Sequence, residues 1–216
     1  MQEGSLRLSL RWSRMSLEDW RQVFAAVGII LILGMSTPLI SRFMPSSSEN
    51  FTAMAILGEN GMAEKYYPNE DANIPLGQPV KWHLYLYNHE EGASYLLVRV
   101  KILDFDSTPP NSTYCTPSPS PDVYEFRRIL ENNETVIIPF EWSILDAENS
   151  SGRILIKRIS INNHQLYPSL SLDSGMLRFV FELWVYDEAS NRFRFDLGNG
   201  SRCVWNQIWF NLTLSA

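Results

Sequence analysis

Two cysteines, Cys115 and Cys203, are the only thiols in this chain of 216 residues. An isolated pair of cysteines outside the cytoplasm is typical of a structural disulfide bond. A bond that closes so long a stretch of chain would stabilise the folded state by ~4 kcal/mol in the chain-entropy model. We therefore expect a Cys115–Cys203 disulfide in the part of the chain assigned below to the cell exterior. Two buried thiols are the alternative.

Side chains that commonly perform catalysis are present but scattered. The three histidines, His83, His89 and His164, belong to no H-E-x-x-H motif, and the chain has no G-x-S-x-G, C-x-x-C or glycine-rich phosphate-binding motif. Neighbouring acids such as Glu90 and Glu91 are more typical of a solvated turn than of a calcium site. We expect no catalytic residue, no metal site and no cofactor, so we interpret the chain as a non-enzyme.

Six asparagines begin N-x-Ser/Thr sequons, where chance would give roughly two. All six follow the apolar segment described below: Asn50, Asn111, Asn133, Asn149, Asn199 and Asn211. Because sequons are modified only in exported chains, this excess predicts a glycoprotein whose sugars lie outside the cell. A polar loop composition that raises the chance rate is the alternative explanation.

The overall composition favours a folded, acidic protein. Apolar residues make up 45% of the chain and charged residues 19%, which is sufficient for a packed core. The formal net charge of −6 argues against a nucleic-acid partner, because the phosphate backbone selects basic surfaces.

One uncharged segment, Val23–Ile40, is long enough to cross most of a bilayer as a helix. Four arginines precede it and one follows it closely: Arg7, Arg11, Arg14 and Arg21 before, Arg42 after. By the positive-inside rule, this asymmetry predicts a cytoplasmic N-terminus and an extracellular C-terminal part.

The expected organisation follows from this segment. We predict a cytoplasmic tail at 1–16, a single transmembrane anchor helix at 17–42, a stalk at 43–50 and an extracellular domain at 51–216, in a protein of the cell membrane. A cleaved secretory signal is the alternative. Its apolar region is usually shorter and ends at a small-residue cleavage site, so the length of this segment favours an uncleaved anchor.

The sequence after residue 50 alternates apolar and polar residues with period two, which is typical of β-strands. The turn-forming residues Asn88–Gly92 separate two such runs and predict a hairpin between them. Such runs occur at 51–57, 80–87, 95–102, 123–130, 135–144, 154–161, 177–186, 192–195 and 204–214. They predict an all-β fold, an immunoglobulin-like antiparallel β-sandwich, with a core of alternate residues such as Trp82, Phe179 and Phe210.

Several aromatic residues fall on the outward side of these predicted strands. We interpret six of them as a candidate contact face: Trp184, Tyr186, Trp205, Trp209, Tyr85 and Tyr95. The proline-rich segment 107–122 is expected to be stiff and extended. Because it contains Cys115, we expect the disulfide to pin it across Trp205. Cover of the remaining aromatic residues by a second sheet, by this segment or by glycans is the alternative.

Several stretches together resemble an archaeal family of membrane proteins, the domain of unknown function 1616 family. The stretches are Leu17–Val23 (LEDWRQV), Phe51–Pro68 (FTAMAILGENGMAEKYYP), Leu86–Glu90 (LYNHE), Pro117–Arg127 (PSPSPDVYEFR), Asn133–Phe140 (NETVIIPF), Phe181–Asp187 (FELWVYD) and Ile208–Thr213 (IWFNLT). The resemblance covers residues 17–214 in order and spacing. It implies an archaeal source and a location in the cell envelope, and it carries over no catalytic residue.

The function that these observations favour is a membrane-anchored binding or assembly module of an archaeal cell envelope. Its expected partners are the membrane, crossed once, and an envelope protein or glycan; a homo-oligomer is left open. A non-catalytic accessory subunit of a membrane enzyme or transporter is one alternative. An enzyme acting on surface polysaccharide is another.

Overall fold

The computed structural model describes residues 20–21, 24–31, 50–196 and 202–214. The chain divides into two units, Met1–Glu49 and Asn50–Ala216. In the first unit, residues 20–21 and 24–31 are helical. Among the described residues, no helix combines the length and the apolar character needed to cross a membrane. The predicted tail, nearly all of the stalk and most of the predicted anchor lie outside the described residues.

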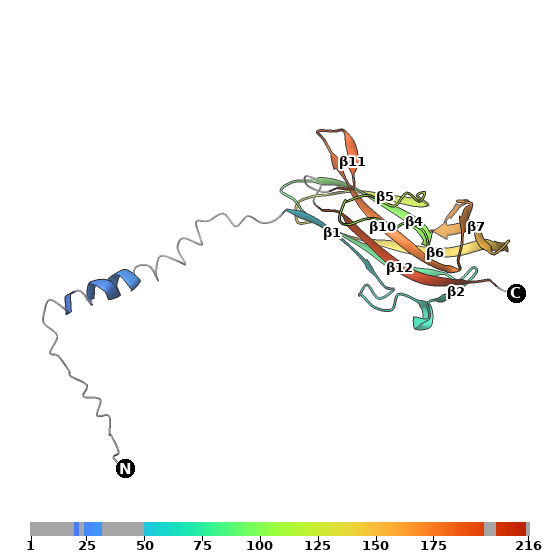
Figure 1. Ribbon diagram of the computed structural model, residues 1–216, viewed down its shortest axis with the longest axis horizontal. Helices are drawn as coiled ribbons and strands as arrows, with labels where there is room; N and C mark the ends of the chain where they lie inside the picture. Colours follow the sequence, from blue (N-terminus) through green and yellow to red (C-terminus); the bar gives the residue numbers. More distant parts are fainter. Residues whose placement is uncertain (1–19, 22–23, 32–49, 197–201, 215–216) are drawn as a thin grey trace, which may run out of the picture. The chain divides into compact units, whose positions relative to one another are not determined.

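The second unit is an all-β sandwich of two sheets (Figure 1). Sheet A contains, in order, β1 (Phe51–Leu57), β3 (Val80–His89), β6 (Thr135–Ser150), β7 (Arg153–Ile161) and β8 (His164–Leu166), and β9 (Leu170–Leu172) also pairs with β7. Sheet B contains β2 (Asn73–Pro75), β12 (Val204–Thr213), β10 (Met176–Asp187), β4 (Ser94–Asp104) and β5 (Tyr124–Leu130), and β11 (Arg192–Arg194) also pairs with β10. The 3-10 turn η1 (Pro68–Glu70) precedes β2. The β2–β12 pair is parallel, and the others are antiparallel.

Aromatic side chains from both sheets form the centre of the core. Trp82 of sheet A meets Phe179 of sheet B edge-to-face, with 5.5 Å between ring centroids. Other pairs across the sheets are Phe140–Phe181 at 5.2 Å and Trp142–Phe210 at 4.8 Å. Because successive strand residues point to opposite faces, the period-two pattern identified these inward positions correctly. Of the residues assigned to the core from that pattern, only Ile208 is half-buried.

Strand boundaries differ from the sequence prediction where the alternation breaks. β1 spans the predicted residues, but β6 continues six residues beyond Ile144, to Ser150. Register shifts between Ile144 and Ala147 disturb the period-two pattern there, so the sequence signal ended early. β2, β8 and β9 have three residues each, which is too short for a periodic signal.

The hairpin predicted at Asn88–Gly92 is wrong, because β3 lies in sheet A and β4 in sheet B. The connection crosses between the sheets around the fully buried Asn88. The Nδ2 atom of Asn88 lies 2.9–3.1 Å from the carbonyl oxygens of Gly92, Leu130 and Glu131. Its Oδ1 accepts hydrogen bonds from the Ser94 hydroxyl and the Glu90 amide. One side chain therefore satisfies the backbone of two chain segments that turn between the sheets.

Replacing Asn88 by alanine should leave these buried carbonyl groups without a donor. We expect Asn88→Ala to lower the free energy of unfolding by about 3 kcal/mol. Urea unfolding followed by tryptophan fluorescence measures the change. Asn132→Ala, in the exposed turn between β5 and β6, is the matched control and should have little effect. Equal midpoints for the two variants would contradict the role assigned to Asn88.

Candidate binding surfaces

The outer face of sheet B contains an ion pair that is removed from water. Lys101 of β4 and Glu182 of the adjacent β10 have 4% and 0% exposed side chains, and Lys101 Nζ lies 3.1 Å from Glu182 Oε2. Ser118 bonds to both partners. Its carbonyl oxygen accepts from Lys101 Nζ at 2.6 Å, and its N–H donates to Glu182 Oε1 at 2.7 Å. The indole of Trp184 also donates to Glu182, at 3.3 Å.

This ion pair places the proline-rich segment 107–122 over sheet B. Asp122, at the end of the segment, lies 3.6 Å from Lys101 Nζ and 3.5 Å from Arg99 Nε. The segment bonds to Lys101, Arg178 and Glu182, and these three belong to the buried outward side chains of β4 and β10. We call these buried outward side chains the closed face: Leu97, Lys101, Leu103, Arg178, Val180 and Glu182.

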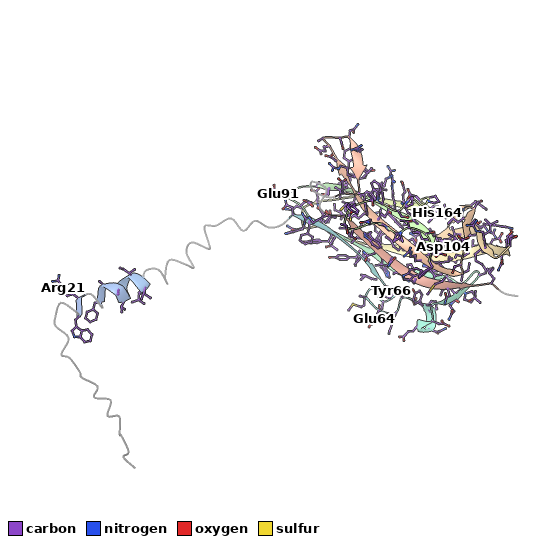
Figure 2. The ribbon with its side chains drawn as sticks, viewed as in Figure 1. Arg21, Glu64, Tyr66, Glu91, Asp104 and His164 are labelled. Atoms are coloured by element: carbon purple, nitrogen blue, oxygen red, sulfur yellow. The ribbon has the colours of Figure 1, made fainter. Side chains whose placement is uncertain are left out.

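A buried arginine, Arg178, anchors the start of the same segment. Arg178 donates to the carbonyl oxygen of Ser107 at 2.7 Å and to Gln207 at 3.0 Å. Burial lowers the pKa of the Arg178 guanidinium, and the negative charge of Asp104 opposes that shift. Burial alone would raise the pKa of the Asp104 carboxyl, but hydrogen bonds from Ser107 and from the Asp173 amide outweigh it and hold that pKa below its usual value. Asp104 stands at the end of β4 (Figure 2).

The two cysteines meet at this segment, but the predicted disulfide is not formed, and both are free thiols. Cys115 Sγ lies 3.9 Å from the Ser112 carbonyl oxygen, and Cys203 Sγ lies 4.0 Å from the same oxygen. The segment does cross Trp205, whose Nε1 donates to the Ser112 hydroxyl at 2.9 Å. Hydrogen bonds and the buried ion pair therefore hold the segment without a covalent bridge. Burial, and then the neighbouring Cys115 thiol, raise the pKa of Cys203 to about 12.

The six aromatic residues proposed as one contact face lie on two different sheets. Tyr85 belongs to β3 in sheet A, whereas the other five lie on sheet B. Those five are half-buried, and most have partners within the domain. Arg99 stacks on Trp184 at 4.2 Å and Arg178 on Trp209 at 4.6 Å.

Tyr95 and Tyr186 pack around Phe193, at 4.9 and 5.4 Å between ring centroids. Phe193 lies on β11, whose hairpin with β10 extends beyond the body of the sandwich (Figure 1). Period two assigns a residue to one side of its own strand but does not say to which sheet that strand belongs.

The predicted glycan acceptors lie at the surface wherever they are described. Asn111, Asn133, Asn149 and Asn211 are exposed, Asn50 is half-buried, and Asn199 lies outside the described residues. Asn111 Oδ1 accepts from the amides of Thr113 and Tyr114 at 2.8 and 3.0 Å, which fixes a local turn in the segment that covers the closed face.

The outer face of sheet A differs from the closed face in both composition and cover. The outward side chains of β1, of residues 83–89 in β3 and of residues 135–139 in β6 include no lysine, arginine, aspartate or glutamate, and none of them is buried. The next outward residues along β3 and β6 are the charged Lys81 and Glu141. Phe51 and Ile137 are 39% and 53% exposed. We call this surface the open face: Phe51, Ala53, Ala55, Leu57, His83, Tyr85, Tyr87, His89, Thr135, Ile137 and Pro139. Of these residues, the sequence alone assigned only Tyr85 to a contact face, and His83 and His89 were named only as scattered histidines. The absence of charge on the outward positions of β1 and of residues 83–89 was the signal that could have identified the surface.

The described surface has several open hollows. One of about 500 Å³ lies between β5 and the β7–β8 turn and is lined by residues such as Tyr124, Arg128, Glu141 and His164. His164 is labelled in Figure 2. Within the described residues, no three His, Cys, Asp or Glu side chains come close enough together to hold a metal ion.

No protein-family model and no curated protein matches the sequence. Among solved structures, the chain is similar to the CARDB domain of the PF1109 protein from Pyrococcus furiosus, in complex with di-metal ions, with 11% identity, a TM-score of 0.37 and coverage of 77% of this chain and 90% of that one. It is also similar to beta-glucosidase from Listeria innocua in complex with glucose, with 10% identity, a TM-score of 0.37 and coverage of 76% of this chain and 16% of that one. These likenesses are too distant to carry an argument about function. The described domain is thus defined by its own geometry, as an all-β sandwich with one closed and one open outer face.

Removing one partner of the buried ion pair should leave the other charge unpaired. We expect Lys101→Met to lower the free energy of unfolding by ~3–5 kcal/mol. The double variant Lys101→Met, Glu182→Gln should lose less, because it removes both charges while the introduced amide oxygen still accepts from the Ser118 N–H. Urea unfolding measures both. Lys157→Met, which breaks the exposed pair with Glu148, is the control and should change stability little. A Lys101 variant as stable as this control would refute the assignment.

The raised pKa of Cys203 should protect this thiol from alkylation. At pH 8 its thiolate population is about a thousandfold below that of a thiol with the usual pKa of 9.0, because the two values differ by three units. Iodoacetamide should therefore modify Cys203 slowly in the folded protein and at the ordinary rate in urea, as followed by peptide mass spectrometry. Equally fast modification in both conditions would contradict the burial of this thiol.

Proposed function

We propose that this chain is a membrane-anchored binding or assembly module of an archaeal cell envelope. In this proposal the helix at 17–42 crosses the membrane once, with the N-terminus in the cytoplasm. The sandwich, of immunoglobulin-like type, lies outside the cell as a glycoprotein and performs no catalysis. The resemblance to the domain of unknown function 1616 family supports the archaeal source and the envelope location.

Two features of the sequence support the membrane assignment. The segment Val23–Ile40 carries no charge, and arginines are concentrated before it. The sequon asparagines all follow it, and those that are described lie at the surface of the sandwich, where a glycan has room. Orientation and glycosylation are thus mutually consistent parts of one proposal.

The open face is the observation that supports a binding role most directly. An antiparallel sheet that faces water usually carries polar side chains on its outward side. Here the outward side chains of three neighbouring strands are mainly alanine, tyrosine and other uncharged groups. Contiguous exposed apolar surface of this kind typically marks a site of contact with a partner, because its exposure to water is unfavourable in free energy. The closed face of sheet B differs in this respect, because the segment 107–122 lies over it.

A photo-crosslinking amino acid at Tyr85 tests this role in the full-length chain in its native membranes. We expect irradiation to join the chain to a defined protein that sediments with the membrane. Tyr167, a 71% exposed tyrosine beyond β8, is the matched control position and should give no such product. Products of equal yield from both positions, or none from Tyr85, would overturn the binding role. A product containing a subunit of a membrane enzyme or transporter would identify the chain as an accessory subunit.

A further inference from the structure

We infer that the open face binds the open face of a second copy of this chain. This inference rests on the proposed function, because it identifies the partner of the same surface. The grounds are the arrangement of small and large side chains on the face, the direction of β1, and the size and charge of the surface.

The open face has a hollow column beside a raised one. On β1 the outward residues Ala53 and Ala55 are small, and their register partners on β3 are Tyr87 and Tyr85. The Tyr85 hydroxyl has no hydrogen-bond partner among the described residues. Tyrosine supplies large, rigid contact area at low entropic cost, and an alanine column leaves space for it. Each copy therefore offers both a ridge and the groove that receives such a ridge.

A twofold axis that runs parallel to the strands, between β1 and β3, brings these columns together. Rotation about that axis places β1 of one copy opposite β3 of the other, so that each tyrosine column packs against an alanine column. Sheets packed face to face keep their strands within about 30° of one another, which this arrangement allows.

The same axis agrees with the proposed anchor, which requires both copies to enter one membrane. Asn50 directly precedes β1, so the strand direction fixes the end of the sandwich from which the anchor segment leaves. Rotation about an axis parallel to the strands keeps both β1 strands pointing the same way. The two anchor segments then leave from the same end and can enter one membrane. Rotation about an axis perpendicular to the strands would send them in opposite directions.

The charge of the surface agrees with contact between identical faces. Two identical charged faces repel each other where like charges meet, but the open face contains no lysine, arginine, aspartate or glutamate. Lys81 and Glu141, which have opposite charges, are register partners beyond one end of the face.

The area of the surface predicts an interaction that depends on the membrane. With this axis only β1 and β3 of the two copies face each other, and two strands of about seven residues give a footprint of roughly 10 Å by 24 Å. That is below the roughly 800 Å² per partner of a stable interface between freely diffusing proteins. Anchoring both copies in one membrane raises their effective concentration, so the contact is favoured there and is lost on dilution in detergent.

Energy transfer between full-length copies tests the inference. Copies fused at the C-terminus to a donor or an acceptor fluorescent protein are reconstituted in phosphatidylcholine vesicles at a low protein-to-lipid ratio. We expect transfer well above the level of random proximity. Ala55→Arg should reduce the dimer population at least tenfold, while Ile129→Arg, at a 66% exposed position on sheet B, should leave it unchanged. Because both side chains point outward, circular dichroism should show that both variants fold.

A size exchange separates packing from a simple loss of structure. Ala55→Phe and Tyr85→Ala should each reduce the transfer, the first by filling the groove and the second by removing the ridge. The double variant exchanges the two columns and should restore transfer to within about twofold of the original. Failure of that rescue, or transfer that Ala55→Arg leaves unchanged, would overturn the inference.

The outcome also separates this inference from the proposed function. Crosslinking from Tyr85 to a different protein, together with random energy transfer, would refute the second copy as partner while the binding role stands. Absence of both the crosslink and the transfer would refute both.

Discussion

The ion pair between Lys101 and Glu182 is the interaction on which the arrangement of the domain most depends. Removing two charges from water costs several kcal/mol per ion, and their attraction offsets this cost only when every remaining donor and acceptor is satisfied. Ser118 meets that condition with its own backbone, as acceptor for one partner and donor to the other. The position of the proline-rich segment follows from this requirement, because no side chain of sheet B could replace both bonds. The contacts of that segment with Trp205 and with the two thiols are consequences of the same placement.

The two outer faces of the sandwich differ in whether a segment of the chain covers their outward side chains. The strands of sheet B carry charged and apolar residues outward, and a chain segment covers them. On sheet A, the side chains of the open face include no lysine, arginine, aspartate or glutamate, and none of them is buried. Natural sequences depart from local rules mainly where function requires it. Under the proposed function, the departure on sheet A is of this kind, because contact with a partner would remove the apolar open face from water.

Much of the fold could be predicted from the sequence, and the failures have identifiable causes. Alternation gave the strands and the inward positions of residues such as Trp82 and Phe179, because period two is a local property of an extended chain. The assignment of strands to sheets could not be predicted in the same way. Asn88 appeared to be an ordinary turn residue, and only its buried contacts reveal a connection between sheets. Tyr85 was grouped with the aromatic residues of sheet B because alternation along a strand does not predict the sheet to which that strand belongs. The outward position of Glu182 was predictable, but its burial was not, because a loop far along the chain covers it.

The edges of the sheets explain why association would use a face. An exposed edge strand offers unpaired backbone groups to any other strand, and proteins commonly block such edges. On β1, the carbonyl oxygens of Met54 and Ile56 already accept hydrogen bonds from Asn206 and Tyr66, and the Asn50 carbonyl just before the strand accepts one from Arg202. On β5, the Arg127 carbonyl accepts from the guanidinium of Arg128, and the Leu130 carbonyl from Asn88. With these carbonyl groups occupied, backbone pairing between molecules is disfavoured, whereas the side chains of the open face remain available. Recognition would therefore depend on side-chain size and shape, which can distinguish one partner from another far better than backbone pairing can.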